Sequence, residues 1–240
     1  MKLNILNSEE TIIKIKEGYS ICRFGDGEFY IILMRKRDIK GIQTYSDILR
    51  QKLLFILHNP TPNLLIGIPT EEYKERITFV KKFHRDFIKY HKPNDTNFIY
   101  ASAYFTRPDC TKKLNEKYFN LVRSIWDNKN VVLVNFNSEL KKFKLFSNCN
   151  TIEFVEIPRR DCFFEYENIL NECKKYFKKG YIFLLSCGPT ATVLSHDINV
   201  RGEIAIDIGQ ISLCYSLFIK EDGLKWTSQN AYRLNFRGNK

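Results

Sequence analysis

Short apolar stretches alternate with longer amphipathic stretches along most of this chain, and this alternation limits the possible folds more than any other feature. The amphipathic stretches repeat apolar residues every three or four positions, as Leu114, Tyr118 and Leu121 do, which is typical of helices with one buried face. Strands that alternate with helices predict an α/β fold with a mainly parallel sheet. The strands are expected at residues 19–24, 63–68, 97–102, 131–135, 151–157, 181–186 and 203–208.

Helices are expected to join these strands into one folding unit. No internal repeat, low-complexity tract or linker interrupts the pattern, and 240 residues fall within the size of one domain. We therefore expect a single domain over residues 1–240, with a sheet of about six or seven strands flanked by helices. The helices are expected at residues 28–34, 46–58, 70–90, 111–126, 161–177 and 190–199, with a further C-terminal helix and tail over 212–240.

The chain is basic, with a formal net charge of +11 and an isoelectric point of about 9.2. A positive balance suits an anionic partner, which can be a nucleic acid, a membrane surface or a phosphorylated small molecule. A lysine-rich solvated surface explains the same charge without any partner. The basic residues are scattered, so charge alone does not choose between these interpretations.

The seven cysteines are spread singly, and no C-x-x-C pair is present. This spacing fits neither a disulfide framework nor a zinc site, and it favours a reducing cytoplasm. The first 16 residues lack the apolar core of a signal peptide, and no apolar stretch approaches the roughly 20 residues that span a bilayer. We expect a cytoplasmic protein, with the inner face of the membrane as a further location.

The sequence Arg23-Phe24-Gly25-Asp26-Gly27-Glu28 directly follows the first predicted strand. Glycines on both sides of Asp26 allow a ligand to approach the backbone closely. Asp26 and Glu28 can point to one side and hold Mg²⁺ or Mn²⁺, and Arg23 can add a fork for phosphate. A tight turn, with Asp26 as a turn residue and Glu28 in the first helical turn, explains the same residues without a ligand.

A second candidate segment, Cys187 to Thr192 (CGPTAT), follows the apolar strand at 181–186. A strand, a glycine and then a helix direct free backbone N–H groups at an anion, and Pro189 suits the first helical position. Gly188 and the hydroxyls of Thr190 and Thr192 are the expected phosphate contacts; ordinary N-capping by Thr190 is the alternative. The segment matches neither a Walker A loop nor a dinucleotide-binding motif.

Two more charged positions follow predicted strands. Asp207 lies near the end of the apolar strand at 203–208, where an unpaired carboxylate is costly to bury, so it faces a cleft or has a local partner. Arg160 follows the fifth strand, where it suits a phosphate or a carboxylate. Carboxyl ends of parallel strands form the ligand-binding edge of such sheets. The four segments together therefore predict a site for a nucleoside diphosphate with a divalent cation.

These segments (RFGDGE, IPRRDCFFEYENIL, GPTATVL and AIDIG) occur in this order between residues 18 and 210. In this respect the chain resembles the bacterial GT-D-type glycosyltransferases, first catalogued as a domain of unknown function. The resemblance implies a Rossmann-like fold, an Asp-x-Glu motif that binds a divalent cation, and sugar transfer from a nucleotide sugar, typically UDP-linked. Asp26 and Glu28 match that motif. Gln210 stands where the family usually has histidine, and residues 137–148 replace an expected glycine-rich turn.

We therefore expect a Mn²⁺- or Mg²⁺-dependent hexosyltransferase that takes its sugar from a UDP-linked donor and does not bind nucleic acid. The expected acceptor is a glycan, a glycoprotein or a lipid-linked molecule. The alternatives are a non-catalytic nucleic-acid-binding domain and a metal-dependent phosphohydrolase. The expected catalytic residues are Asp26, Glu28 and Asp207, of which Asp26 and Glu28 bind the metal, and the expected donor-binding residues are Arg23, Phe24, Gly25, Gly27, Arg160, Gly188, Pro189 and Thr190.

Overall fold

The computed structural model describes residues 3–33, 42–59, 61–91 and 98–219. Within these ranges the protein forms one seven-stranded sheet in the order β3-β2-β1-β7-β6-β4-β5, and every neighbouring pair is parallel. The predicted α/β class and parallel sheet are confirmed. The strands are β1 Ser20–Arg23, β2 Leu64–Ile68, β3 Ile99–Ser102, β4 Asn130–Asn135, β5 Thr151–Glu156, β6 Tyr181–Leu185 and β7 Ile204–Asp207.

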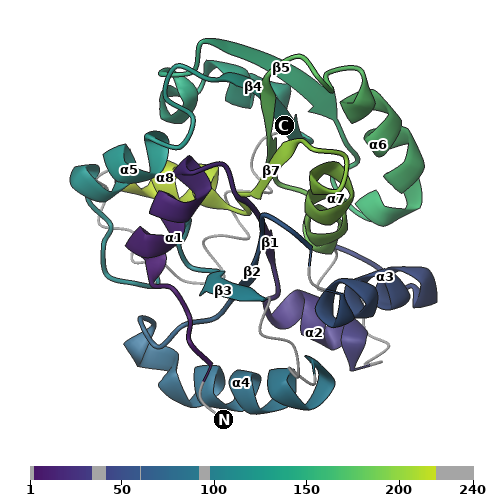
Figure 1. The fold of residues 1–240 in the computed structure, drawn as a ribbon. Helices are drawn as coiled ribbons and strands as arrows, with labels where there is room; N and C mark the ends of the chain where they lie inside the picture. The colour runs from purple at the N-terminus through teal and green to yellow at the C-terminus, as the bar shows by residue number, and fades with distance from the viewer. Residues whose placement is uncertain (1–2, 34–41, 60, 92–97, 220–240) are drawn as a thin grey trace, which may run out of the picture.

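Helices cover both faces of this sheet, and Figure 1 shows one layer on its left and the other on its right and along its bottom. One layer contains α2 Asp26–Ile32, α3 Asp47–His58, α4 Ile77–His91, α6 Tyr166–Lys174 and α7 Pro189–Asn199. The other contains α1 Ser8–Lys16, α5 Glu116–Arg123 and α8 Ile211–Ile219. Short 3₁₀ helices lie at η1 Lys74–Arg76, η2 Ser138–Lys142, η3 Lys144–Phe146 and η4 Cys162–Glu165.

Successive strand residues belong to opposite cores, as the two-residue period of a β-strand requires. In β1, Ile21 packs in the core beneath α1, α5 and α8, whereas Cys22 packs in the core beneath α2, α3 and α7. Leu65 and Ile66 of β2 divide in the same way. Both faces of the sheet are therefore buried, which explains why these strands are almost continuously apolar.

Several predicted helices begin later than the sequence pattern suggested. The helix expected at 70–90 becomes α4 only at Ile77, because a turn and η1 come first. The helix expected at 111–126 begins after Asn115, whose side chain caps α5 by accepting from the Tyr118 N–H at 3.0 Å. Helix α1 was not predicted, although Asn7 and Glu10 form a capping box at its start.

The strand order creates a topological switch point between β1 and β7. The chain winds outward from β1 through β2 to β3, crosses to β4 and the edge strand β5, and returns through β6 and β7. After β1 it enters α2 on one face, and after β7 it enters α8 on the other face. Ligands bind α/β sheets at the carboxyl edge beside such a point, so the ends of β1 and β7 are where a site is expected.

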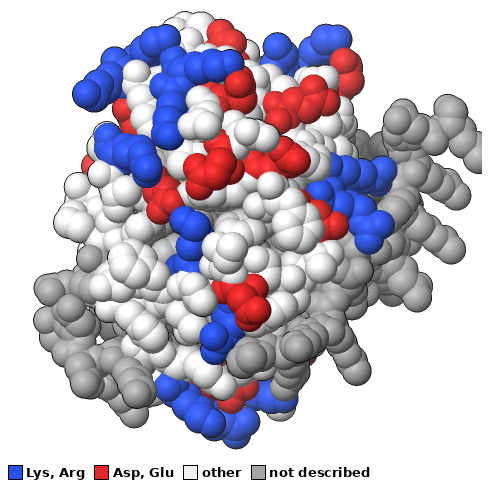
Figure 2. Space-filling view, turned by 90° about the vertical axis from the view of Figure 1, so that its right-hand side faces the viewer, with Lys and Arg blue, Asp and Glu red and all other residues white. Residues whose placement is uncertain are grey.

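Charge is mixed on the face shown in Figure 2, where acidic and basic side chains are interspersed. Such a surface does not favour a polyanion over other partners. No helix within the described residues is both long and apolar enough to cross a membrane. The predicted tail at 220–240 and the predicted element ends at residues 34 and 97 lie outside the described residues. The single domain over 1–240 stays a prediction.

Candidate active site

The turn from β1 into α2 presents the Asp-x-Glu pair at the switch point. Phe24 is fully buried beneath the turn, and Gly25 is the N-cap of α2. Asp26, the first helical residue, is exposed, and among the described residues its Oδ1 accepts only from the Gly27 N–H, at 3.1 Å. Glu28 is partly buried, and its Oε2 accepts from the Gly25 N–H at 2.7 Å. One oxygen of Glu28 therefore caps the helix, while Asp26 faces outward.

Electrostatics at Glu28 are unfavourable for an ionised carboxylate. Burial, and then the negative charges of Asp207 and Asp26, raise the pKa of Glu28 to about 7, although hydrogen bonds at Gly25 and Glu28 oppose this shift. A bound cation would lower the free energy of the charged form. This is the environment expected of a carboxylate that is completed by a ligand.

The carboxylates of Asp26 and Glu28 are consistent with a hard divalent cation. Within the described ranges, no group of three or more His, Cys, Asp or Glu side chains is arranged to hold a metal by itself. Magnesium-type ions are commonly held by one or two carboxylates, with substrate phosphates and water as the remaining ligands. The donor set therefore fits a cation that binds together with a phosphorylated substrate.

Arg23 and Asp207 form a buried ion pair at the ends of β1 and β7. The Arg23 Nη2 lies 2.8 Å from Asp207 Oδ1, and the two side chains are 17% and 5% exposed. Asp207 Oδ1 also accepts from the Gly209 N–H at 3.0 Å. Burial raises the pKa of Asp207, and the charge of Arg23 opposes this shift. Of the two possibilities for Asp207, a cleft-facing position or a local partner, the structure therefore shows the local partner.

Arg23 also reaches the loop that follows β3. Its Nη1 donates to the Ala103 carbonyl at 3.3 Å and to Thr106 Oγ1 at 3.1 Å. Its buried Nε has no hydrogen-bond partner among the described residues. The predicted phosphate-binding fork is therefore largely occupied, and Arg23 holds together the carboxyl ends of β1, β7 and β3.

The start of α7 presents backbone rather than hydroxyl groups. Gly188 is exposed and has a φ of +60°, whereas Pro189 and Thr190 are buried. The Thr190 hydroxyl donates to Gln43 Oε1 at 3.4 Å, and the Thr192 hydroxyl donates to the Arg23 carbonyl at 2.8 Å. The expectation that the Thr190 and Thr192 hydroxyls face a phosphate is corrected, because both side chains are turned into the protein.

Gln43 is a site-proximal residue that the sequence analysis missed. It is 1% exposed, and its Oε1 also accepts from the Phe163 N–H at 3.1 Å. The residues on either side of Gln43 form hydrogen bonds with Asp161. The Asp161 N–H donates to the Ile42 carbonyl at 2.8 Å, and Asp161 Oδ1 accepts from the Thr44 N–H at 2.5 Å. No local pattern signals these contacts, since they join positions more than 100 residues apart.

Arg160 is exposed in the loop after β5, with no hydrogen bond or ion pair to the rest of the described chain. Because β5 is the outermost strand, it lies roughly 19 Å from β1 by ordinary strand spacing. The fold brings Arg160 to the same edge of the sheet as Asp26 but does not place the two side by side. Arg159, its neighbour, lies over the Phe136 ring at 5.5 Å.

The two departures from the family pattern also have defined positions. Gln210 is exposed directly after Gly209 and precedes α8 at the same edge of the sheet. Residues 137–148 form η2 and η3, and Leu145 and Phe146 of η3 are buried beneath the second helix layer. This segment therefore contributes to the core as well as to the edge.

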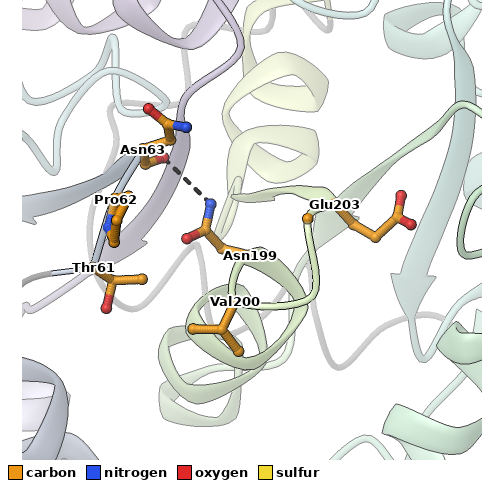
Figure 3. Close-up of a pocket in the computed structure, with 7 residues that line it drawn as sticks. Thr61, Pro62, Asn63, Asn199, Val200 and Glu203 are labelled. Atoms are coloured by element: carbon orange, nitrogen blue, oxygen red, sulfur yellow. Dashed lines mark hydrogen bonds between the residues drawn. The ribbon is translucent and has the colours of Figure 1, made fainter.

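A cavity of about 350 Å³ lies at the opposite, amino edge of the sheet (Figure 3). It is bordered by the segments that precede β2 and β7 and by the end of α7, where Asn199 Nδ2 donates to the Asn63 carbonyl at 3.4 Å. The cavity is remote from Asp26 and Glu28, so it does not belong to the candidate site.

Comparisons with known proteins agree on one family. The family model described as the glycosyltransferase GT-D fold matches residues 21–232. Glycosyltransferase GlyD of Streptococcus pneumoniae serotype 4 is 26% identical over 218 residues, which are 84% of this chain and 26% of that protein. Probable glycosyl transferase Gly of Streptococcus gordonii is 25% identical over 232 residues, 90% of this chain and 33% of that protein. The chain thus spans about a quarter to a third of these relatives.

Solved structures share the fold over nearly the whole chain. One, described as domain of unknown function 1792 with a distinct glycosyltransferase fold, superposes with a TM-score of 0.79 at 25% identity, covering 96% of this chain and 88% of that one. Another, described as a new glycosyltransferase from Streptococcus sanguinis, has a TM-score of 0.79 at 22% identity and covers 98% and 93%. The second likeness concerns the fold alone.

Proposed function

The chain belongs to the GT-D family of glycosyltransferases, and on that premise we propose that it transfers a hexose from a UDP-linked donor with the help of Mn²⁺ or Mg²⁺. Asp26 and Glu28 are the proposed metal ligands. The observation that carries the proposal is the position of this pair: both acids lie in the first turn of α2 beside the β1/β7 switch point, and the pKa of Glu28 is raised to about 7. A cation there would stabilise the charged form of Glu28, which burial and the neighbouring carboxylates disfavour.

Asp26 and Glu28 would hold the cation, which would supply positive charge to stabilise the diphosphate leaving group. The protein residues position this chemistry. Gly25 anchors Glu28 through its N–H, and Asp26 faces outward from a helix start that itself favours negative charge. Arg23 and Asp207 keep the ends of three strands together, so that this turn is held rigidly. Preorganisation of this kind limits the reorganisation needed during reaction.

Donor contacts beyond the metal are proposed at the start of α7. Gly188 is exposed there, and the helix start is positively polarised, which suits a phosphate oxygen. Arg160 is proposed to contact a more distant part of the donor, since β5 is the outermost strand. Gln210 is exposed at this edge, at the position where the family usually has histidine. We therefore assign no catalytic base at this position.

The acceptor is proposed to be a glycan, a glycoprotein or a lipid-linked molecule, and the reaction is proposed to occur in the cytoplasm, including its membrane face. The net charge of +11 favours the approach of anionic donors and of an anionic membrane surface. The nucleic-acid-binding alternative has no observation in its favour beyond this charge.

The proposal is tested by thermal shift with UDP-, GDP-, CMP- and dTDP-sugars, each with and without Mn²⁺. A ligand that binds the folded state raises the melting temperature, by an amount set by its concentration relative to Kd. We expect a UDP-sugar with Mn²⁺ to stabilise the wild type and Asp26→Asn to lose this stabilisation. Asp26 is exposed, and its hydrogen bond with the Gly27 N–H is local, so the variant should fold normally.

Asp47→Asn is the matched control, because Asp47 is also an exposed acid at the first position of a helix, α3. It should keep the full metal-dependent shift. If Asp26→Asn keeps the shift as well, the metal assignment is wrong. Release of inorganic phosphate from the donor without any acceptor would instead support the phosphohydrolase alternative.

A further inference from the structure

An aromatic surface lies at the carboxyl ends of β2 and β3. Tyr73 follows β2 and Tyr104 follows β3, and their rings meet edge to face with centroids 5.5 Å apart at 87°. Tyr104 is 9% exposed, Tyr73 is more exposed, and the Arg76 guanidinium lies 5.8 Å from the centre of the Tyr73 ring. We call Tyr73, Tyr104 and Arg76 the tyrosine platform. These residues lie outside the proposed donor site.

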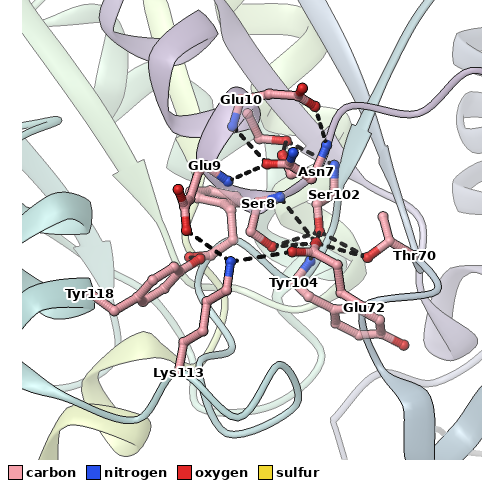
Figure 4. A network of polar contacts seen from close by, with 12 residues as sticks. Asn7, Ser8, Glu9, Glu10, Thr70, Glu72, Ser102, Tyr104, Lys113 and Tyr118 are labelled. Atoms are coloured by element: carbon pink, nitrogen blue, oxygen red, sulfur yellow. Dashed lines mark hydrogen bonds and ion pairs between the residues drawn. The ribbon is translucent and has the colours of Figure 1, made fainter.

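The platform is held in place by the polar network in Figure 4. Glu72, which precedes Tyr73, accepts through Oε2 from the Ser8 N–H at 3.0 Å, the Ser8 hydroxyl at 2.7 Å and the Ser102 hydroxyl at 3.1 Å. Ser102 Oγ in turn accepts from the Tyr104 N–H at 3.1 Å. The backbone on both sides of the platform is therefore anchored, and the Tyr104 ring points away from the network (Figure 4). A rigid surface loses little entropy when it binds a ligand.

The tyrosine platform adjoins the Asp-x-Glu turn. Arg23, three residues before Asp26, donates to the carbonyl of Ala103, the residue before Tyr104, at 3.3 Å. β2 lies between β1 and β3 in the sheet, so the segments that carry Tyr73 and Tyr104 leave the sheet at the edge beside the end of β1. The aromatic rings and the proposed metal ligand therefore belong to one continuous part of the edge.

The two sides of β1 suit different halves of a transfer reaction. The α7 start and Arg160 lie on the β6 and β5 side, where the donor phosphates are proposed to extend. An acceptor hydroxyl must come within about 3–3.5 Å of the sugar carbon beside the metal-bound diphosphate. β2 is the neighbour of β1, whereas Phe136 follows β4, three strands from β1 and roughly 14 Å away. The tyrosine platform is thus an aromatic surface on the strands beside β1, on the side away from the proposed phosphate contacts.

We propose that the tyrosine platform binds a pyranose ring of the acceptor, which packs its C–H face on the exposed part of Tyr73 while Arg76 donates hydrogen bonds to its hydroxyls. Aromatic rings offer sugars an apolar face, and a nearby guanidinium satisfies polar groups at the rim. This inference rests on the proposed glycosyltransferase function, because only that function makes the bound sugar an acceptor. Binding of the sugar itself can be measured separately.

Binding is tested by saturation-transfer NMR with the methyl glycosides of glucose, galactose and N-acetylglucosamine as probes. We expect at least one glycoside to receive saturation from the wild type. Tyr73→Phe keeps the ring and should keep the signal, whereas Tyr73→Ala should weaken binding about fivefold. Tyr73 is partly exposed, so its truncation leaves the core intact.

Tyr176→Ala is the matched control, because Tyr176 and Tyr181 form a similar edge-to-face pair, with centroids 5.4 Å apart, at the amino end of β6. It should leave glycoside binding unchanged. Equal signals from Tyr73→Ala and the wild type, or no saturation of any glycoside by the wild type, would overturn the proposal. Glycoside binding without any stabilisation by nucleotide sugars would keep the sugar site and reject the transferase function, so the two failures are distinguishable.

Discussion

At the scale of single residues, Gly209 shows how closely the Arg23–Asp207 pair is packed. Gly209 has a φ of +49°, and a Cβ added to it would lie 1.8 Å from the Arg23 Nη2. Its N–H also donates to Asp207 at 3.0 Å. Both the left-handed backbone and the contact require glycine, since any side chain would displace the guanidinium.

We predict that Gly209→Ala lowers the free energy of unfolding by about 3 kcal/mol, because it adds backbone strain and separates a buried ion pair. Urea denaturation measures this change. Gly202→Ala is the control: Gly202 has a φ of +84° but nothing within 4 Å of an added Cβ, so only strain of about 1 kcal/mol is expected. Equal losses in the two variants would contradict the role given to the Arg23 contact.

Also at this scale, the Asp-x-Glu pair was predicted at the turn where it lies, because a glycine-flanked acid after a strand is a local signal. Its environment was not predictable. The hydrogen bond from the Gly25 N–H to Glu28 is local, since the two residues are three positions apart. The rise in the pKa of Glu28 to about 7 depends instead on burial and on the distant Asp207 as well as on Asp26. Thr190 shows the opposite outcome. The local pattern predicted an exposed hydroxyl, but in the structure this hydroxyl is buried and donates to Gln43, which is 147 positions away.

At the scale of elements, helix ends were predicted least well. Local caps determine where α1 and α5 begin, and Asn7 and Asn115 supply them, but apolar periodicity continues beyond such caps. The end of α4 shows a different determinant. His91, its last residue, is 2% exposed, and its Nε2 lies 2.7 Å from the Tyr100 hydroxyl on β3. This buried hydrogen bond joins the end of α4 to the sheet.

Acidic pH should lower the free energy of unfolding through protonation of His91. Burial lowers the pKa of His91 to about 4, whereas an unfolded histidine has a pKa near 6.5. Between pH 4 and pH 6.5 the proton binds His91 in the unfolded chain but not in the folded one. The contribution of neutral His91 to the free energy of unfolding is therefore complete above pH 6.5 and is lost as the pH falls toward 4. We predict a loss of about 3 kcal/mol in the free energy of unfolding across this interval relative to the His91→Gln variant.

Urea denaturation at a series of pH values measures the difference between wild type and variant. His84→Gln, a substitution on the same helix, is the control and should follow the wild-type pH dependence, because His91 is untouched. A parallel pH dependence in the wild type and in His91→Gln would refute the assignment.

At the scale of the whole molecule, one sheet joins the two halves of the chain. β1 pairs with β7, and α7 packs against both of these strands at the junction, so neither half has a complete sheet of its own. Leu65 in β2 and Leu133 in β4 lie in one continuous core although they belong to different halves. Shared burial of this kind couples the halves during unfolding.

We predict a single calorimetric transition whose van't Hoff and calorimetric enthalpies agree. Leu65→Ala and Leu133→Ala remove side chains that are fully buried, so each should lower the melting temperature of that same transition by roughly 5–15 °C. Two separable transitions, each moved by one substitution, would contradict the prediction of a single domain.

The sequence by itself determined the strands, the class of fold and the turns at which chemistry occurs, because all three depend on periodicity and on residues a few positions apart. Only the tertiary structure decided which side chains meet. Arg23 pairs with Asp207 across 184 positions, and Tyr73 meets Tyr104, because the strand order places β7 beside β1 and β3 beside β2. That order follows from how the helices bury both faces of the sheet, which no short stretch of sequence specifies.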